Sequence, residues 1–484
     1  MARALPLAAA TWPLLACFGG LLALDRTGLR PAADAPWATA LFLAVLLLAF
    51  AGLFRAMKRL EPSLAQAAGE LPVAGLLVVA ALLRLLAAPL SPSLSDDVHR
   101  YLWDGRVAAS GANPYLLEPD HPDLAGLRND LWQRTAHRDV ATVYPPLSLS
   151  LFAAASLLPQ PLLSYKLTLA TVDLVACGML LVLARRRTSV VAALAYVWNP
   201  LVVIEGAGMG HVDVLGASLA IACVYLVPVR SGAHSGSARS LAAGAAAALG
   251  VLVKLVPLAA IPLWWRRIKG HRQRGRLFAL GGACLLLPGA AGVLVLTGGF
   301  PPGLVVYALR WEYNGPLYEP VWRLLDVLQL DHAAAGLVHA VRLVFGGEIE
   351  APPWDTLYAH TYPQFLARAL LLLGAIAAWL RLWRQRPGPV GAAFGAFGIV
   401  LLASPTLYPW YLIWILPWAA LLGARWVLLL SATLPLAYLP AFAGVDYFPW
   451  VYSAVWLPPL LLYLVDRRRQ MHAAKVSGSR TERR

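Results

Sequence analysis

Long apolar runs follow one another along almost the whole chain, and they decide what it can fold into. Runs that approach the roughly 20 residues a helix needs to cross a bilayer lie near residues 4–24, 36–54, 73–90, 162–184, 188–204, 212–229, 277–297, 364–383, 389–403, 409–423, 426–443 and 449–465. The stretch 240–265 forms either one long span or two short ones hinged around Lys254 and Pro257. The sequence therefore predicts an all-α polytopic membrane protein of 12 to 14 transmembrane helices, with a single domain over residues 1–465.

Composition excludes several other classes of protein. Hydrophobic residues make up 59% of the 484 residues and charged residues 13%, whereas soluble proteins carry about 25% charged residues. A disordered chain and a water-soluble one are both excluded. The formal net charge is +15, but the basic residues lie in short groups between apolar runs, so no nucleic-acid partner is expected. The four cysteines lie inside apolar runs and predict neither a disulfide nor a zinc site.

Groups of Lys and Arg separate the apolar runs and predict the orientation of the chain. They lie at residues 55–59, 185–187, 266–276 and 381–386 and in the tail from residue 467. Because short basic loops stay in the cytoplasm, both termini are expected there, with the protein in the inner (cytoplasmic) membrane. This placement requires 240–265 to be a hairpin and 145–158 to be re-entrant or interfacial. It leaves two longer outer segments, 91–145 and 298–363, and a basic cytoplasmic tail over 466–484 that is expected to be disordered.

The start of the first outer segment carries the most informative polar residues. Asp96 and Asp97 follow a membrane exit, and repulsion between adjacent carboxylates can raise the pKa of one of them. If residues 96–106 are helical, one face carries a base, two polar partners and an aromatic ring, namely Asp97, Arg100, Asp104 and Tyr101. Such a face fits a phosphorylated, hydroxyl-rich substrate. The alternative is a capped amphipathic helix, in which the carboxylates only stabilise the helix dipole.

A series of short motifs extends along most of the chain. In order they are Asp96-Asp97, Arg100-Tyr101, Trp103-Asp104-Gly105-Arg106, Asn113-Pro114-Tyr115, Tyr144-Pro145-Pro146, Trp198-Asn199-Pro200, Gly210-His211-Val212-Asp213, Lys254-Leu255-Val256-Pro257, Ser404-Pro405 and Tyr408-Pro409-Trp410-Tyr411. In their order and their spacing relative to the spans, they resemble the GT-C superfamily of integral-membrane glycosyltransferases. The resemblance is closest to bacterial polyprenyl-phosphate-mannose-dependent mannosyltransferases, glycosyltransferase family 87 and its neighbours.

The resemblance implies a GT-C-type helix bundle and a membrane glycosyltransferase. Such an enzyme moves a hexose, here mannose, from a polyprenyl-phosphate donor to a glycan or glycolipid acceptor on the extracytoplasmic face, with inversion. An aspartate of the first outer loop acts as general base. By this resemblance the base is Asp97 or Asp96, and Asp97 is slightly favoured because it shares the face with Arg100.

Cations are expected near the leaving phosphate, on which negative charge grows. The candidates are Arg100, Lys254, Arg84, Arg106 and Lys166. Lys254 is the strongest of these candidates, because it is a lone cation within an apolar stretch and charged residues inside a membrane usually have a functional role. The alternative for Lys254 and Arg84 is that the side chain snorkels to the interface.

The remaining candidates are expected to contact the sugar or the acceptor. They are Tyr101, Asp104, Asn113, Tyr144, His211, Asp213, Tyr408 and Trp410. His211 and Asp213 could hold sugar hydroxyls or an optional divalent ion, but two such residues make a weak metal motif, so no obligatory cofactor is expected. The alternatives are a polar turn at His211 and an interfacial aromatic belt at Tyr408.

A second function is compatible with many spans and buried cations: a transporter or flippase of a lipid-linked saccharide. A transporter is expected to show repeat symmetry and broken helices at mid-membrane. The polar residues here gather at one face instead, which favours chemistry at one surface. A third reading, a purely structural or assembly protein, does not account for Asp96 and Asp97 beside Arg100.

Overall fold

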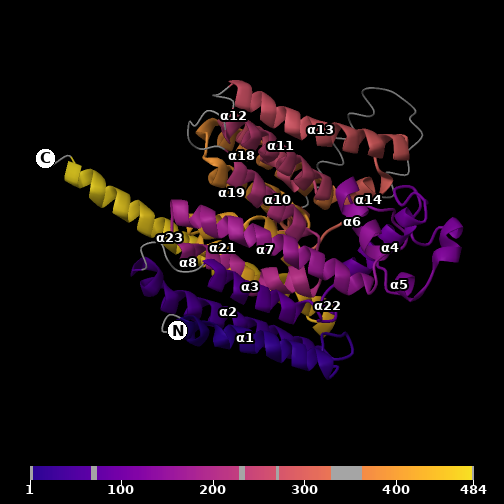
Figure 1. Ribbon diagram of the computed structural model, residues 1–484, viewed down its shortest axis with the longest axis horizontal. Coiled ribbons are helices and arrows are strands. Elements are labelled where there is room, and N and C mark those ends of the chain that lie inside the picture. Colours follow the sequence, from indigo (N-terminus) through magenta and orange to yellow (C-terminus); the bar gives the residue numbers. More distant parts are fainter. Residues whose placement is uncertain (1–3, 67–72, 228–234, 269–271, 329–361, 482–484) are drawn as a thin grey trace.

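The computed structural model describes residues 4–66, 73–227, 235–268, 272–328 and 362–481, and in these residues the regular structure is helical (Figure 1). Extended pairing in the described part is confined to isolated bridges between 313–314 and Thr406. The predicted all-α membrane fold is confirmed. The predicted second outer segment lies partly outside the described residues, which resume at 362.

Eight helical segments of the described residues are long and apolar enough to cross a bilayer. Six are formed by α1 (Ala4–Arg26), α2 (Pro36–Gln66), α7 (Pro161–Arg187), α11 (Ser235–Val253), α13 (Arg272–Thr297) and α18 (Tyr362–Gln385). The seventh joins α21 (Arg425–Thr433), η5 (Leu434–Tyr438) and α22 (Leu439–Ala443), and the eighth joins η6 (Tyr447–Val451) to α23 (Tyr452–Thr481). A ninth is α8 (Val190–Val197) with α9 (Pro200–Val203) and η2 (Ile204–Gly208), bent by 41°.

This number is lower than the 12 to 14 predicted spans, because other predicted spans form helices that are too short. They are α3 (Val73–Ala87), α10 (Asp213–Leu226), α19 (Pro389–Ala403) and α20 (Leu416–Leu422). A helix of about 15 residues extends only about 22 Å, less than the hydrocarbon core. Each of α10 and α19 has one end at a motif. Asp213 opens α10, and α19 stops before Pro405, which disfavours helix at the residue preceding it.

The predicted hairpin over 240–265 is present. In the contact between α11 and α13, Gly244 abuts Phe278 and Leu252 abuts Gly289, so the two helices run in parallel. The chain must therefore run back from the end of α11 to the start of α13, and it does so through η3 (Val256–Ala259) and α12 (Ile261–Ile268). Lys254 lies at the turn, directly after α11.

Asn199 terminates one half of the bent pair and begins the other. Its side-chain oxygen accepts a hydrogen bond from the Leu201 N–H at 3.0 Å, and its amide donates to Ser431 Oγ at 3.1 Å. With Pro200 in the first helical position, this is a helix N-cap. The Trp198-Asn199-Pro200 motif therefore forms the break of this span.

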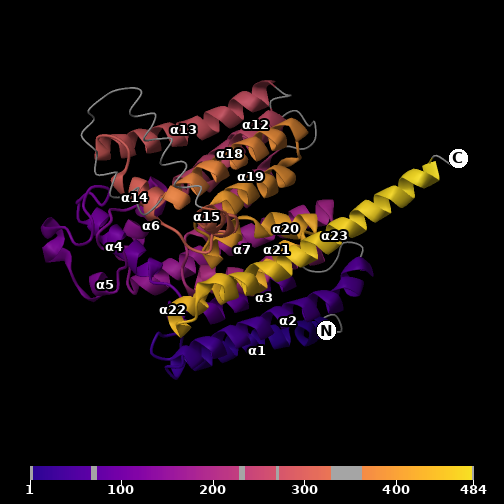
Figure 2. The same cartoon turned by 180° about the vertical axis from the view of Figure 1, so that it is seen from behind.

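Both chain ends lie at one end of the bundle, and the polar loops lie at the other (Figures 1 and 2). The loop end contains α4 (Asp97–Ala109), α5 (Asp130–Gln133), α6 (Pro146–Ser156) and α14 (Pro302–Arg310). Gly105 lets α4 pack directly on α6, because a Cβ there would lie 2.3 Å from the Phe152 carbonyl. The re-entrant or interfacial segment predicted over 145–158 corresponds to the short helix α6.

The C-terminal tail differs from the sequence prediction. Helix α23 continues to Thr481 in the described residues, where a disordered tail over 466–484 was expected. Arg, Gln, Met, Ala and Lys are good helix formers, and they extend a helix already begun in the preceding span.

Candidate active site

The first turn of α4 places Asp97 where two cavities of about 570 Å³ meet. We call them the long cavity, which contains Lys254 and Asp213, and the loop cavity, which lies beside the loop 92–96. Asp97 lines both, whereas its neighbour Asp96 is exposed and lines only the loop cavity. The structure thus separates two adjacent carboxylates, between which the sequence favours Asp97 only slightly.

Asp97 is held from within its own helix. The Tyr101 hydroxyl donates to Asp97 Oδ2 at 3.3 Å, and Tyr101 stacks on Phe152 with centroids 4.7 Å apart. Burial raises the pKa of the Asp97 carboxyl, His211 and Lys254 oppose the rise, and Asp96 reinforces it. Because the Tyr101 ring is packed in the interior, its hydroxyl is fixed in place and holds the Asp97 carboxylate in position.

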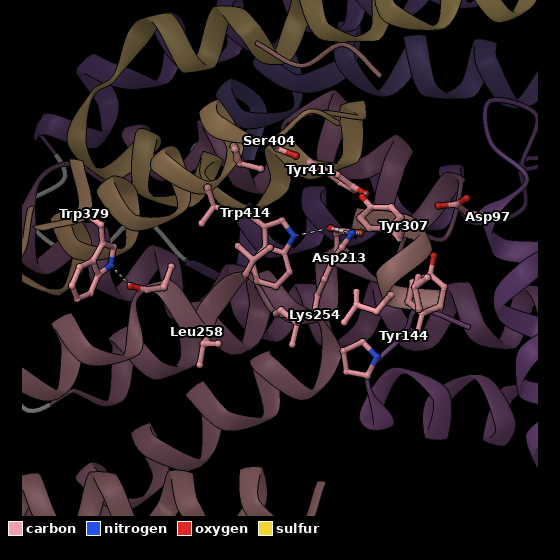
Figure 3. Close-up of a pocket in the computed structure, with 18 residues that line it drawn as sticks. Asp97, Tyr144, Asp213, Lys254, Leu258, Tyr307, Trp379, Ser404, Tyr411 and Trp414 are labelled. Carbon is pink, nitrogen blue, oxygen red and sulfur yellow. Dashed lines mark hydrogen bonds and ion pairs between the residues drawn. The ribbon is translucent and has the colours of Figure 1, made fainter. Parts of the chain in front are cut away.

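The long cavity extends from a polar end to an apolar end (Figure 3). Asp97 and Tyr144 lie at one end, and Trp379 and Leu258 lie at the other. The Trp379 indole N–H donates to the Ala259 carbonyl at 2.8 Å, which fixes the ring against η3. Most of the remaining wall is apolar, with Val143, Leu255, Val256, Leu304, Val400 and Leu401.

An ion pair lies in the middle of the long cavity (Figure 3). Lys254 Nζ is 2.8 and 3.0 Å from the two oxygens of Asp213, and it lies 4.0 Å from the centroid of the Tyr411 ring. The Trp414 indole N–H donates to the same carboxylate at 2.6 Å. Asp213 is fully buried, but the Lys254 side chain keeps 22% of its surface exposed and faces the cavity. An ammonium has three donors, so Lys254 can bind a further acceptor.

His211 is buried behind the loop cavity. Its Nδ1 lies 3.0 Å from Glu205 Oε2, and the Tyr438 hydroxyl donates to Glu205 Oε1 at 2.9 Å. The imidazole stacks on Trp410 with centroids 3.8 Å apart and planes 10° from parallel. Glu205, His211 and Tyr438 therefore form one fixed polar unit under Trp410.

The aromatic rings at the outer turn stack on one another. Trp410 is parallel to Tyr408, with centroids 4.4 Å apart, and Tyr408 stacks on Tyr313 at 4.6 Å. Because His211 covers the other face of Trp410, neither face of that indole is free. In this arrangement a sugar ring cannot stack on the indole of Trp410.

Arg100 and Asp104 form an internal clamp. Arg100 Nε lies 2.8 Å from Asp104 Oδ1, and the two Nη atoms donate to the carbonyls of His137 and Val140 at 2.8 and 2.6 Å. Burial raises the pKa of Asp104, and Arg100 opposes the rise. The pair thus holds the loop 137–140 on α4, and Arg100 also lines a cavity of about 70 Å³ next to Asp97.

Four other predicted site residues lie away from both cavities. Arg84 forms a buried ion pair with Asp173 inside the bundle, and Arg106 is exposed on α4. The remaining two bind backbone: Lys166 Nζ donates to the carbonyls of Ala88 and Leu90 at 3.1 and 2.6 Å, and Asn113 Nδ2 donates to Leu296 O at 2.7 Å.

Four aromatic side chains of the long cavity are absent from the predicted site residues: Tyr307, Trp379, Tyr411 and Trp414. Trp414 could have been found, because Tyr411 and Trp414 are three residues apart in η4 (Pro409–Trp414), and such side chains eclipse in a 3₁₀-helix. Tyr307 and Trp379 lie in apolar runs that carry no local signal. Within the described residues, no group of three or more His, Cys, Asp or Glu side chains could hold a metal ion.

Comparisons with known proteins agree with the GT-C resemblance. Residues 8–266 match the family model of the alpha-(1->6)-mannopyranosyltransferase N-terminal domain, a range that includes Asp97, Asp213 and Lys254. A probable alpha-(1->6)-mannopyranosyltransferase of Mycolicibacterium smegmatis is 26% identical over 376 residues. The alignment covers 69% of this chain and 63% of that relative, so it spans less than two thirds of the relative's length. No solved structure matches.

Proposed function

The chain belongs to the alpha-(1->6)-mannopyranosyltransferase family, and we propose that it transfers mannose from a polyprenyl-phosphate donor to a hydroxyl of a glycan or glycolipid acceptor. One observation carries the proposal. The largely apolar long cavity contains a cation, Lys254, and ends at a partly buried carboxylate, Asp97. The apolar wall suits a lipid chain, the cation suits its phosphate, and the carboxylate suits the reacting sugar, in the same order along the cavity.

The donor is proposed to occupy the long cavity. Its prenyl chain lies along the apolar wall towards Trp379, where burial of apolar surface is favourable, and its phosphate lies at Lys254. Negative charge grows on that phosphate as the sugar leaves. The ammonium stabilises this charge in a site with little water. Asp213 and the Tyr411 ring fix the ammonium in position.

Asp97 is proposed to act as the general base. The acceptor oxygen attacks the anomeric carbon while the bond from that carbon to the phosphate oxygen breaks, and the bonding electrons leave with the phosphate. The acceptor proton moves to Asp97, and the single displacement inverts the anomeric centre. A carboxylate with a raised pKa is a better proton acceptor late in such a step.

The active site is proposed to face the extracytoplasmic side. Arg185, Arg186 and Arg187 end α7 at the end of the bundle that holds both chain termini. Basic residues mark the cytoplasmic side, and Asp97 lies at the opposite end. We also propose that transfer needs no obligatory divalent ion, since Lys254 supplies positive charge at the leaving group.

A transfer assay tests this function directly. Purified protein in lipid nanodiscs is given radiolabelled polyprenyl-phosphate-mannose and a soluble α-(1→6)-linked oligomannoside. We expect labelled mannose in the oligosaccharide, and no transfer when GDP-mannose replaces the lipid donor. Transfer from the nucleotide sugar with none from the lipid donor would refute the proposal. Addition of EDTA should leave the rate unchanged.

A further inference from the structure

The loop cavity differs chemically from the long cavity, although the two share Asp97. Its polar wall comes from the loop before α4, from α4 and from the segment after α5, and it contains Ser93, Ser95, Asp96, His99, Arg134 and His137. Tyr408 and Tyr438 also line this cavity. A lipid chain placed here would strip water from charged groups, which is costly. A hydroxyl-rich molecule would replace that water with hydrogen bonds.

The loop cavity is open at the surface of the bundle. Asp96, Arg134 and His137 are exposed, and so is Ala441 on α22. Helices α4 and α22 lie at the end of the bundle away from both termini (Figures 1 and 2). Its volume of about 570 Å³ is in the ordinary range for a ligand pocket. A water-soluble chain can therefore enter it without crossing the apolar wall of the long cavity.

A reaction with two substrates and one base requires both substrates to reach that base. Asp97 lines both cavities, whereas Lys254 lines only the long one and Arg134 only the loop one. If the donor fills the long cavity, the acceptor hydroxyl must approach Asp97 from another side. The loop cavity provides that approach.

We infer that the loop cavity binds the acceptor, as a hydroxyl-rich saccharide chain whose terminal sugar reaches Asp97 between Tyr408 and the first turn of α4. This inference rests on the proposed function and specifies which cavity takes which substrate. Recognition comes from hydrogen bonds to side chains such as Arg134 and Tyr408. Because the faces of Trp410 are covered, ring stacking on that indole is not the means of recognition.

Steady-state kinetics of variants separate the two cavities. Arg134→Ala removes hydrogen-bond donors from the loop cavity, and Ala441→Trp fills part of it from an exposed position. Loss of one or two hydrogen bonds should raise the acceptor KM about threefold to tenfold, and the bulky variant should raise it further. The donor KM should stay within twofold. Trp379→Ala should raise the donor KM and leave the acceptor KM within twofold, because Trp379 lines only the apolar end of the long cavity.

The matched control is Arg106→Ala, which removes an arginine that is exposed on α4 outside both cavities. It should change neither KM. Transfer by the wild-type protein is measured first, and its absence refutes the proposed function itself. If the wild type is active but Arg134→Ala and Ala441→Trp leave the acceptor KM unchanged, or raise only the donor KM, the assignment of the loop cavity is wrong.

Two acceptors that carry the same oligomannoside, one free in solution and one attached to a lipid, show whether a lipid on the acceptor contributes to binding. If only the sugars bind, Arg134→Ala raises both KM values by the same factor. An effect on neither acceptor contradicts the inference. Unfolding temperatures of all variants, followed by tryptophan fluorescence, confirm that folding is not the cause.

Discussion

Lys254 and Asp213 are 41 residues apart in the chain, yet the ammonium lies 2.8 and 3.0 Å from the two carboxylate oxygens. Each residue lies at a helix end: Lys254 follows α11, and Asp213 begins α10. The ends of two different helices therefore bring a cation and its counter-ion to the wall of one cavity. The pair is proposed to hold a positive charge at a fixed point beside Asp97.

Removal of the cation should affect the chemical step. Lys254→Met is expected to lower kcat by about 10²- to 10³-fold, as loss of one transition-state charge donor usually does, and Lys58→Met on the exposed face of α2 should have no effect. The double variant Lys254→Met/Asp213→Asn should unfold at a higher temperature than Lys254→Met alone, because it leaves no unpaired buried carboxylate, yet remain inactive. Full activity in Lys254→Met would exclude its role at the phosphate.

The two adjacent carboxylates should differ sharply. Asp97→Asn is expected to lower kcat by about 10²- to 10⁴-fold, the usual contribution of a general base. Asp96→Asn, an equally small change at an exposed position, should keep most of the activity. Radiolabel transfer under saturating substrates measures both. The assignment of the base fails if Asp97→Asn stays active or if Asp96→Asn alone abolishes transfer.

The pH profile should report the environment of Asp97. A base works only when deprotonated, so activity is lost as pH falls through its pKa, and burial places that pKa above the ordinary aspartate value. Asp96→Asn removes a neighbouring negative charge and should move the acidic limb of kcat/KM to lower pH. Lys254→Met removes a positive charge and should move it to higher pH. Shifts in the opposite directions would contradict the assignment.

Arg84 should behave as a structural residue, because it is buried against Asp173 on α7 and also donates to the Val197 carbonyl. Asp173→Ala leaves a buried, unpaired guanidinium and should destabilise the fold by about 3–5 kcal/mol, measured as a lower unfolding temperature. The double variant Arg84→Met/Asp173→Leu should recover much of that loss. A higher donor KM in Arg84→Met, with no change in unfolding temperature, would instead support the phosphate-binding role.

The proposed orientation can be tested by cysteine labelling in intact cells, in a variant whose native cysteines are replaced by serine. Arg106→Cys on α4 should react with a membrane-impermeant maleimide, whereas Lys58→Cys, in a basic group near the end of α2, should react only after the cells are opened. Equal labelling of both positions from outside would overturn the topology.

Local contacts were predictable from spacing, and distant ones were not. A helix over 96–106 implies that side chains four apart meet, and the Arg100–Asp104 and Asp97–Tyr101 contacts follow from it. The basic groups likewise required the hairpin at Lys254, which the structure contains. The first inference needs only the repeat of a helix, and the second needs only the rule that short basic loops stay in the cytoplasm.

Contacts between distant segments gave no signal in the sequence. The partner of Arg84 is 89 residues away, and the ring that covers Trp410 belongs to His211. Such pairs depend on how helices pack, which no local pattern encodes. For the same reason the sequence kept Arg84 and Arg100 as further phosphate-ligand candidates after Lys254, although of these three only Lys254 lines the long cavity.

Two residues that line the long cavity, Leu255 and Leu258, are 46% and 53% exposed, so the cavity is open to the outside of the protein there. We propose that the lipid-linked donor enters sideways through this opening while its chain remains in the bilayer. The quantity that governs occupancy is then the number of donor molecules per unit area of leaflet. Diluting the same donor into excess inert lipid should slow the reaction, even at constant bulk concentration.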